Sequence, residues 1–165
     1  MTGLLSHRWL SIPLRILLGG VFLASAYPKL LDPPAFAQMV SNYRVLPAAA
    51  VNAAAIILPW LELGVGLALV TGFMRRGAAA MSGLLMLMFI GALAVNLYRG
   101  TPVDCGCFSV EAVARTPAEK LASMKVDVVR DVALLLASIQ VLVTRVTWRR
   151  PSWPSTPASG TLAVR

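Results

Sequence analysis

The chain has 165 residues, of which 58% are hydrophobic and 13% charged, and its mean hydropathy is +0.74. Soluble domains are about 25% charged, and a chain this apolar has too little polar surface to cover itself in water, so its composition favours an integral membrane protein. The net charge of +8 does not indicate nucleic-acid binding, because the basic residues form no dense run and lie at the ends of apolar segments.

Four apolar segments follow one another in chain order, over residues 12–31, 51–73, 77–98 and 126–146. Each is about 20 residues long, which is enough to cross a hydrocarbon core of about 30 Å as a helix. Backbone groups in lipid must form hydrogen bonds within their own segment, so helices are expected and not open strands. The sequence therefore predicts an all-α fold, an integral membrane four-helix bundle over residues 12–146.

The first segment also has a feature of a secretion signal. Ala24-Ser25-Ala26 resembles a signal-peptidase site. The apolar run is nevertheless long enough to span the membrane, and Tyr27-Pro28-Lys29 continues it without a polar start to a mature protein. We therefore expect a retained first helix.

The connections between the segments differ in character. Residues 32–50 are expected to form a loop, and its first residues, Asp32-Pro33-Pro34, end the first helix. The short Arg75-Arg76 link predicts that the second and third helices are antiparallel neighbours. Residues 99–125 form the longest internal loop, which carries both cysteines and a candidate short helix that begins at Thr116-Pro117.

Charge predicts the orientation in the membrane. Four spans place residues 1–11, the Arg75-Arg76 link and the tail 147–165 on one side, and that side has basic residues and no acidic ones. The tail is rich in Pro, Ser and Thr and is predicted to be disordered. The positive-inside rule then places both termini in the cytoplasm and the cysteine loop outside, in the periplasm of a Gram-negative cell.

The two cysteines stand two positions apart, as Cys105-Gly106-Cys107. Residues this close reach the Cα separation of a disulfide, about 4.4–6.8 Å, only where the chain bends, and Gly106 permits such a bend. A disulfide in so small a ring should be strained, and strained, exposed disulfides tend to be labile or catalytic. We interpret Cys105 and Cys107 as a redox-active pair, with a static disulfide or two packed free thiols as alternatives. A metal site is not expected, because the only histidine, His7, lies on the opposite side.

Five polar residues lie in or beside the apolar segments. Glu62 falls inside the second segment, where a buried charge is expensive and should be paired or functional. Lys29 ends the first segment, Asn96 is near the end of the third, and Arg130 and Asp131 open the fourth. We expect all five in the half of the bundle that carries the cysteine loop, with Lys29 or Arg130 paired to Glu62 and Asn96 bonded to any of them. They form either structural pairs or a polar pocket that holds a quinone headgroup or relays protons.

Several of these motifs together resemble the methylamine utilisation protein MauE family, within the broader DoxX-like group of membrane proteins. The resemblance runs from about Leu14 to Leu142, and its specific part is an Asn-x-x-Arg-Gly helix end followed by Asp-Cys-Gly-Cys-Phe. The matching stretches are Leu14-Arg15 through Leu31-Asp32-Pro33, Asn42-Tyr43-Arg44-Val45-Leu46-Pro47, Pro59-Trp60-Leu61-Glu62-Leu63-Gly64, Asn96-Leu97-Tyr98-Arg99-Gly100 and Asp104-Cys105-Gly106-Cys107-Phe108. The chain departs from the family pattern in its Pro/Ser-rich tail and at Ser109, where glycine is common.

The resemblance implies a four-helix protein of the bacterial inner membrane that supports processing, transport or maturation of the disulfide-rich beta subunit of methylamine dehydrogenase. It also implies a thioredoxin-like periplasmic partner. Combined with the cysteine pair, it leads to the hypothesis of a membrane thiol–disulfide oxidoreductase that acts on this subunit or another periplasmic client, with membrane quinone as a candidate electron partner. The alternatives are a non-catalytic membrane scaffold and a DoxX-like respiratory accessory subunit.

Overall fold

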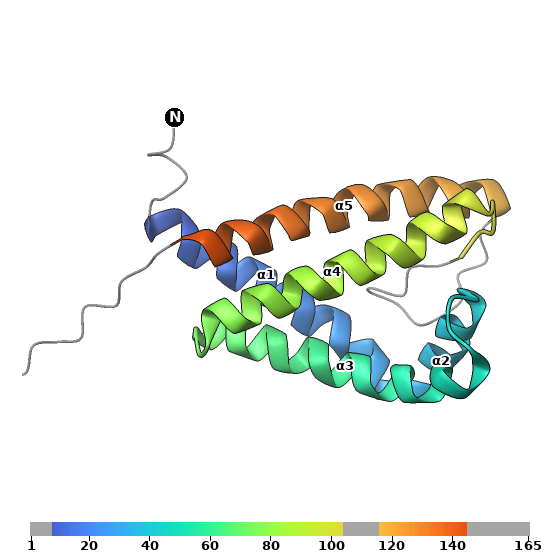
Figure 1. Cartoon of the computed structure of the whole chain (residues 1–165), viewed down its shortest axis with the longest axis horizontal. Helices are drawn as coiled ribbons and strands as arrows, with labels where there is room; N and C mark the ends of the chain where they lie inside the picture. The colour runs from blue at the N-terminus through green and yellow to red at the C-terminus, as the bar shows by residue number, and fades with distance from the viewer. Residues whose placement is uncertain (1–7, 104–115, 145–165) are drawn as a thin grey trace, which may run out of the picture.

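The computed structural model describes residues 8–103 and 116–144, and this part of the chain folds into five helices without a strand. The helices are α1 (Arg8–Leu31), α2 (Pro33–Asn42), α3 (Ala48–Thr71), α4 (Arg75–Tyr98) and α5 (Pro117–Val143). The prediction of an all-α fold is confirmed. The largest contacts join α1 to α3 and α4 to α5; α3 also touches α4 and α1 touches α5, so the four long helices surround a common interior (Figure 1).

Three helices are long and apolar enough to cross a membrane, over Ser11–Leu31, Ala48–Thr71 and Arg75–Tyr98. They correspond to the first three predicted segments, with boundaries shifted by a few residues. The fourth predicted segment, 126–146, lies largely within α5. Residues 117–131 of α5 include six charged residues, Glu119, Lys120, Lys125, Asp127, Arg130 and Asp131, so a fourth membrane span stays a prediction.

The segment expected to be a loop after α1 contains α2, so the loop prediction for residues 32–50 is wrong over Pro33–Asn42. Asp32 caps this helix, because its side chain accepts a hydrogen bond of 3.0 Å from the backbone N–H of Ala35. Pro33 and Pro34 occupy the first two helical positions, where the backbone N–H that proline lacks would have no acceptor within the helix. The same residues that end α1 therefore begin α2, which packs on α3.

The expected short helix at Thr116 is instead the beginning of α5. The Thr116 side chain accepts from the backbone N–H of Glu119 at 3.3 Å, and the Glu119 carboxylate accepts from the backbone N–H of Thr116 at 2.8 Å. This reciprocal capping box starts a helix of 27 residues, so one continuous helix replaces the predicted short helix and separate last segment.

The turn between α3 and α4 is as short as the Arg75-Arg76 link predicts. Gly72 ends α3 in the left-handed region at φ +79°, and Met74 precedes α4 at φ +44°. The two helices run antiparallel, and the turn lies at the opposite end of the molecule from α2 (Figure 1).

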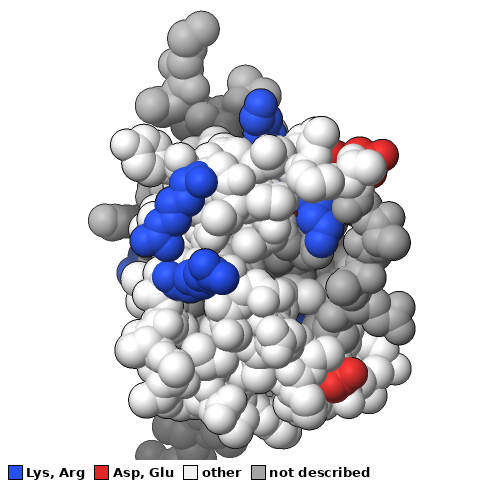
Figure 2. Space-filling model, turned by 90° about the vertical axis from the view of Figure 1, so that its right-hand side faces the viewer, with Lys and Arg blue, Asp and Glu red and all other residues white. Residues whose placement is uncertain are grey.

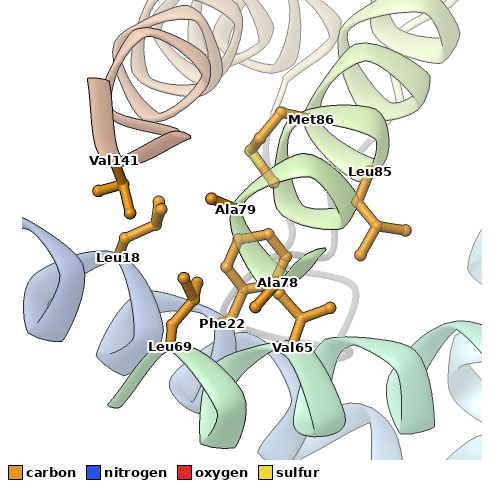
Figure 3. Close-up of a cluster of buried hydrophobic side chains, with 9 residues drawn as sticks. All are labelled: Leu18, Phe22, Val65, Leu69, Ala78, Ala79, Leu85, Met86 and Val141. Atoms are coloured by element: carbon orange, nitrogen blue, oxygen red, sulfur yellow. The ribbon is translucent and has the colours of Figure 1, made fainter. Parts of the chain in front are cut away.

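The hydrophobic core lies between the four long helices, nearer the α3–α4 turn. Figure 3 shows α1 side chains directed toward side chains of the other three helices. The core residues are Leu18 and Phe22 of α1, Val65 and Leu69 of α3, Ala78, Ala79, Leu85 and Met86 of α4, and Val141 of α5. Ser82 of α4 and Ser138 of α5 add a buried hydrogen bond of 3.0 Å, a common link between helices in lipid.

Two glycines allow α1 and α3 to approach closely. A Cβ added to Gly19 would lie 2.9 Å from the Gly66 carbonyl oxygen, and one added to Gly66 would lie 2.9 Å from the Leu23 side chain. Such separations are too short for carbon contacts. The α1–α3 interface therefore requires glycine at Gly19, where the clash is with backbone, whereas a side chain at Gly66 would require the Leu23 side chain to shift.

Candidate functional site

The polar residues of the bundle interior form two linked pairs around a small cavity. Cys105 and Cys107 lie outside the described residues, so the redox pair stays a prediction from the sequence. The five other predicted site residues are all described, and the structure brings four of them together.

Lys29 of α1 and Glu62 of α3 form a buried ion pair. The Lys29 ammonium lies 2.6 and 2.8 Å from the two Glu62 carboxylate oxygens, and the two side chains are 1% and 0% exposed. Lys29 also donates to the Ser25 hydroxyl at 3.0 Å, so all three of its N–H bonds have acceptors. Of the two partners considered for Glu62, the structure selects Lys29.

Aromatic rings enclose the same ammonium group. Its nitrogen lies 5.1 Å from the centre of the Phe36 ring of α2 and 5.3 Å from that of the Phe89 ring of α4. Ring faces attract cations at this distance, and the attraction is stronger where water is excluded. Lys29 therefore joins α1 to α2, α3 and α4.

Arg130 of α5 makes the second set of ion pairs, on its own helix. Its guanidinium contacts the Asp127 carboxylate at 2.9 Å and the Asp131 carboxylate at 3.0 Å. Both Arg130 contacts to Asp131 reach the same oxygen, Oδ1. The other oxygen, Oδ2, is buried and has no hydrogen-bond partner among the described residues.

A cavity of about 20 Å³ joins the two ion-paired groups. Glu62, Ser25, Arg130 and Asp131 line it together with apolar residues of α1, α4 and α5. About 10–15 Å³ is the minimum that a water molecule needs. The cavity can hold one water molecule but not a quinone ring, and no group of three or more His, Cys, Asp or Glu side chains suited to a metal occurs in the described parts of the chain.

Asn96 is not part of this cluster, although it was expected to bond to one of its members. Its amide donates to the Tyr43 carbonyl oxygen at 3.0 Å and to the Ala92 carbonyl oxygen at 2.9 Å. Its side-chain oxygen accepts from the Thr101 hydroxyl at 2.9 Å. Asn96 therefore ties the end of α2 to the chain that leaves α4 toward the cysteines.

Four residues of the site were missed from the sequence: Ser25, Phe36, Phe89 and Asp127. Ser25 stands four positions before Lys29 and Asp127 three before Arg130, spacings that place side chains on one helix face. Both spacings can be identified in the sequence. The two phenylalanines come from α2 and from the middle of α4, and only the packing of those helices shows that they meet Lys29.

Comparison with known proteins identifies the family. A family model described as "Methylamine utilisation protein MauE" matches residues 7–144, most of the chain. The chain belongs to the MauE family. The match includes all five helices and the Cys-Gly-Cys segment, and it confirms the resemblance found in the sequence motifs.

Curated relatives support the MauE assignment. The chain is 44% identical over 88 residues to the methylamine utilization protein MauE of Methylophilus methylotrophus, and 43% identical over 96 residues to that of Paracoccus denitrificans. These alignments cover 53% and 58% of this chain and 46% and 52% of the relatives, so the chain spans about half the length of the MauE proteins it matches. Protein TlpB of Flavobacterium psychrophilum is 31% identical over 123 residues, which are 68% of this chain and 33% of TlpB. No solved structure matches the chain.

Proposed function

We propose that this MauE-family protein is a membrane accessory factor of methylamine utilisation, and that its Cys105–Cys107 pair exchanges a disulfide with a periplasmic protein. The proposed client is the beta subunit of methylamine dehydrogenase or another disulfide-rich protein. Family membership supports the link to methylamine utilisation, and the relatives at 43–44% identity carry that name. The Cys-Gly-Cys sequence supports the chemistry.

The observation that carries the proposal is the way in which both ends of the cysteine segment are anchored. Before it, Val103 is 6% exposed, and its backbone N–H contacts the Met124 sulfur of α5 at 3.5 Å. After it, Thr116 is fixed by the capping box of α5. Both anchors lie at the α2 end of the bundle (Figure 1). The proposed reactive pair therefore belongs to a segment whose two ends are joined to α4 and α5 at this end of the bundle.

The proposed reaction is a reversible thiol–disulfide exchange. A client thiolate attacks one sulfur of the Cys105–Cys107 disulfide and forms a mixed disulfide, which releases the other cysteine as a thiolate. A second client thiolate then attacks the mixed disulfide, so the client gains a disulfide and the pair becomes a dithiol. Two electrons and two protons leave the client, and a thioredoxin-like disulfide or a membrane quinone reoxidises the pair. A quinone ring would bind outside the cavity of about 20 Å³.

The proposed setting is the bacterial inner membrane, with four spans and both termini in the cytoplasm. The outer face of α5 supports a fourth span, because Val129, Leu136 and Val143 are 70%, 61% and 70% exposed. The charged side chains in the middle of α5 are buried or partly buried, since those of Asp131, Asp127 and Arg130 are 2%, 18% and 28% exposed. Figure 2 shows the α2 end, where acidic and basic side chains are separated by uncharged surface. At the other end, the short α3–α4 link carries Arg75 and Arg76, and basic residues in short links favour the cytoplasmic side.

Replacement of both cysteines tests the proposal. In cells with Cys105→Ser/Cys107→Ser, we expect the client to accumulate without its full set of disulfides, measured by thiol alkylation and mass. Ser109→Ala, a change of similar size in the same segment, should leave client maturation normal. Complete maturation with the double variant would contradict the redox role and favour a non-catalytic scaffold.

A further inference from the structure

The cavity between the two ion pairs borders an acidic oxygen that has no described partner. Asp131 is 1% exposed, and its Oδ2 is buried without a hydrogen bond among the described residues. A buried polar atom of this kind is unfavourable unless a proton, a water molecule or a ligand satisfies it. Asp131 also lines the cavity, which has the volume of one water molecule.

The charges around this oxygen do not balance when every group is ionised. Lys29 from α1 and Glu62 from α3 neutralise each other. On α5, Arg130 is shared by the carboxylates of Asp127 and Asp131, so one negative charge is in excess. From α4, the cavity is lined by Met86 and Phe89, which carry no charge. Because Asp131 is buried, an excess negative charge on it is unfavourable, and binding of one proton removes this charge.

We propose that Asp131 is a proton-binding site inside the bundle, with the proton on Oδ2 and one water molecule in the cavity linking it to Glu62. The geometry favours Oδ2 because Oδ1 already accepts two N–H bonds from Arg130, at 3.1 and 3.0 Å. Asp131 is favoured over Glu62 because the Glu62 oxygens accept from Lys29 at 2.6 and 2.8 Å. It is favoured over Asp127, which is 18% exposed and does not line the cavity.

The proton on Oδ2 completes the hydrogen bonding of the cavity. The Asp131 hydroxyl donates to the water molecule, and the water donates to Glu62 Oε2, whose contact with the Ser25 hydroxyl is long at 3.4 Å. The bundle then holds one exchangeable proton between α3 and α5. This inference does not depend on the cysteines, and it goes beyond the proposed disulfide exchange.

Infrared spectroscopy of the full chain in a detergent without ester groups tests the site, because no detergent carbonyl then overlaps the band of a protonated carboxyl group. The carbonyl stretch of a protonated carboxyl group is well separated from carboxylate bands, so it reports the proton directly. At neutral pH we expect this band in the unmodified protein and its loss in Asp131→Asn. Asp32→Asn is the matched control, because Asp32 is exposed and asparagine caps a helix as well as aspartate does. The control should keep the band.

Isotope labelling tests the assignment of the proton to an aspartate in the unmodified protein. Carbon-13 labelling of aspartate should shift the band in the unmodified protein, and labelling of glutamate should leave it in place. A folded protein without the band at neutral pH, a band that persists in Asp131→Asn, or a band that shifts with labelled glutamate would each overturn the assignment to Asp131. Cys105→Ser/Cys107→Ser should not alter the band, so failure of this inference is distinguishable from failure of the disulfide proposal.

Discussion

Lys29 is the residue on which the described polar interior depends most. Its ammonium group is satisfied by Glu62 and Ser25 and enclosed by two aromatic rings from other helices. A charged pair of this kind is expensive to bury and still more expensive to break, because the remaining partner becomes an uncompensated charge. We therefore expect the pair to specify the arrangement of α1 and α3 more than it raises total stability.

Removal of one partner of this pair should destabilise the protein strongly. For Glu62→Leu we expect a loss of about 3–5 kcal/mol in the free energy of unfolding, because the Lys29 ammonium stays buried without a carboxylate. The matched variant Lys29→Met/Glu62→Leu removes both charges and should lose much less. Denaturant unfolding in detergent measures both values. A double variant as unstable as Glu62→Leu would show that the unpaired charge is not the cause.

At the residue scale, the sequence was informative where the cost of a buried charge was involved. Glu62 within an apolar segment indicated a buried pair, and the structure supplies the pair. The sequence alone could not decide whether Lys29 or Arg130 pairs with Glu62, because the answer depends on which helix packs beside α3. Asn96 was misassigned for the same reason: its partners Tyr43 and Thr101 come from chain connections whose positions follow from the fold.

At the scale of helices, the interface between α1 and α3 is the most sharply constrained. Gly19 and Gly66 face each other across it, while Gly20 and Gly64 each have no atom within 4 Å of an added Cβ. The four positions therefore form matched pairs in which the same substitution meets either a packed interface or open space.

Alanine substitutions at these positions should distinguish the effect of close helix packing on stability from the effect of helix propensity. Gly19→Ala should lower the free energy of unfolding by about 1–3 kcal/mol, because the new methyl group would meet the Gly66 carbonyl oxygen of α3 and force the two helices apart. Gly20→Ala should be neutral or stabilising by up to about 1 kcal/mol, because alanine is the better helix former. Thermal unfolding in detergent compares them. Equal effects of the two substitutions would contradict the described interface.

The helices themselves were largely predictable, since long apolar segments have few alternatives in lipid. The errors came from residues that mark both the end of one helix and the start of the next. Asp32-Pro33-Pro34 was interpreted only as a stop, although an aspartate followed by proline is also typical of a helix start. Thr116 was identified as a start, but the charged first half of α5 hid its continuity with the apolar second half.

The two ends of the molecule differ in charge and in what they carry. The α3–α4 turn carries Arg75 and Arg76, and the sequence has no acidic residue near it. The α2 end carries both anchors of the cysteine segment. Together with the exposed apolar faces of the long helices, this polarity underlies the proposed orientation in the membrane.

Labelling with a membrane-impermeant maleimide should reveal this orientation. After mild reduction of intact spheroplasts, we expect Cys105 and Cys107 to be labelled from outside. Arg76→Cys in a Cys105→Ser/Cys107→Ser background should be labelled only after permeabilisation, because the α3–α4 turn faces the cytoplasm. The reverse pattern would contradict the proposed topology.

The most direct test of disulfide exchange is to capture its intermediate. With only one cysteine left, by Cys105→Ser or Cys107→Ser, the remaining thiolate can attack the disulfide of an oxidised periplasmic partner, and the resulting mixed disulfide cannot be resolved within the pair. We predict that at least one of these variants accumulates a larger species, isolated from acid-quenched membranes, that separates on reduction into this chain and a periplasmic thiol protein. Failure of both variants to form such a species, in cells that contain the client, would contradict a role in disulfide exchange.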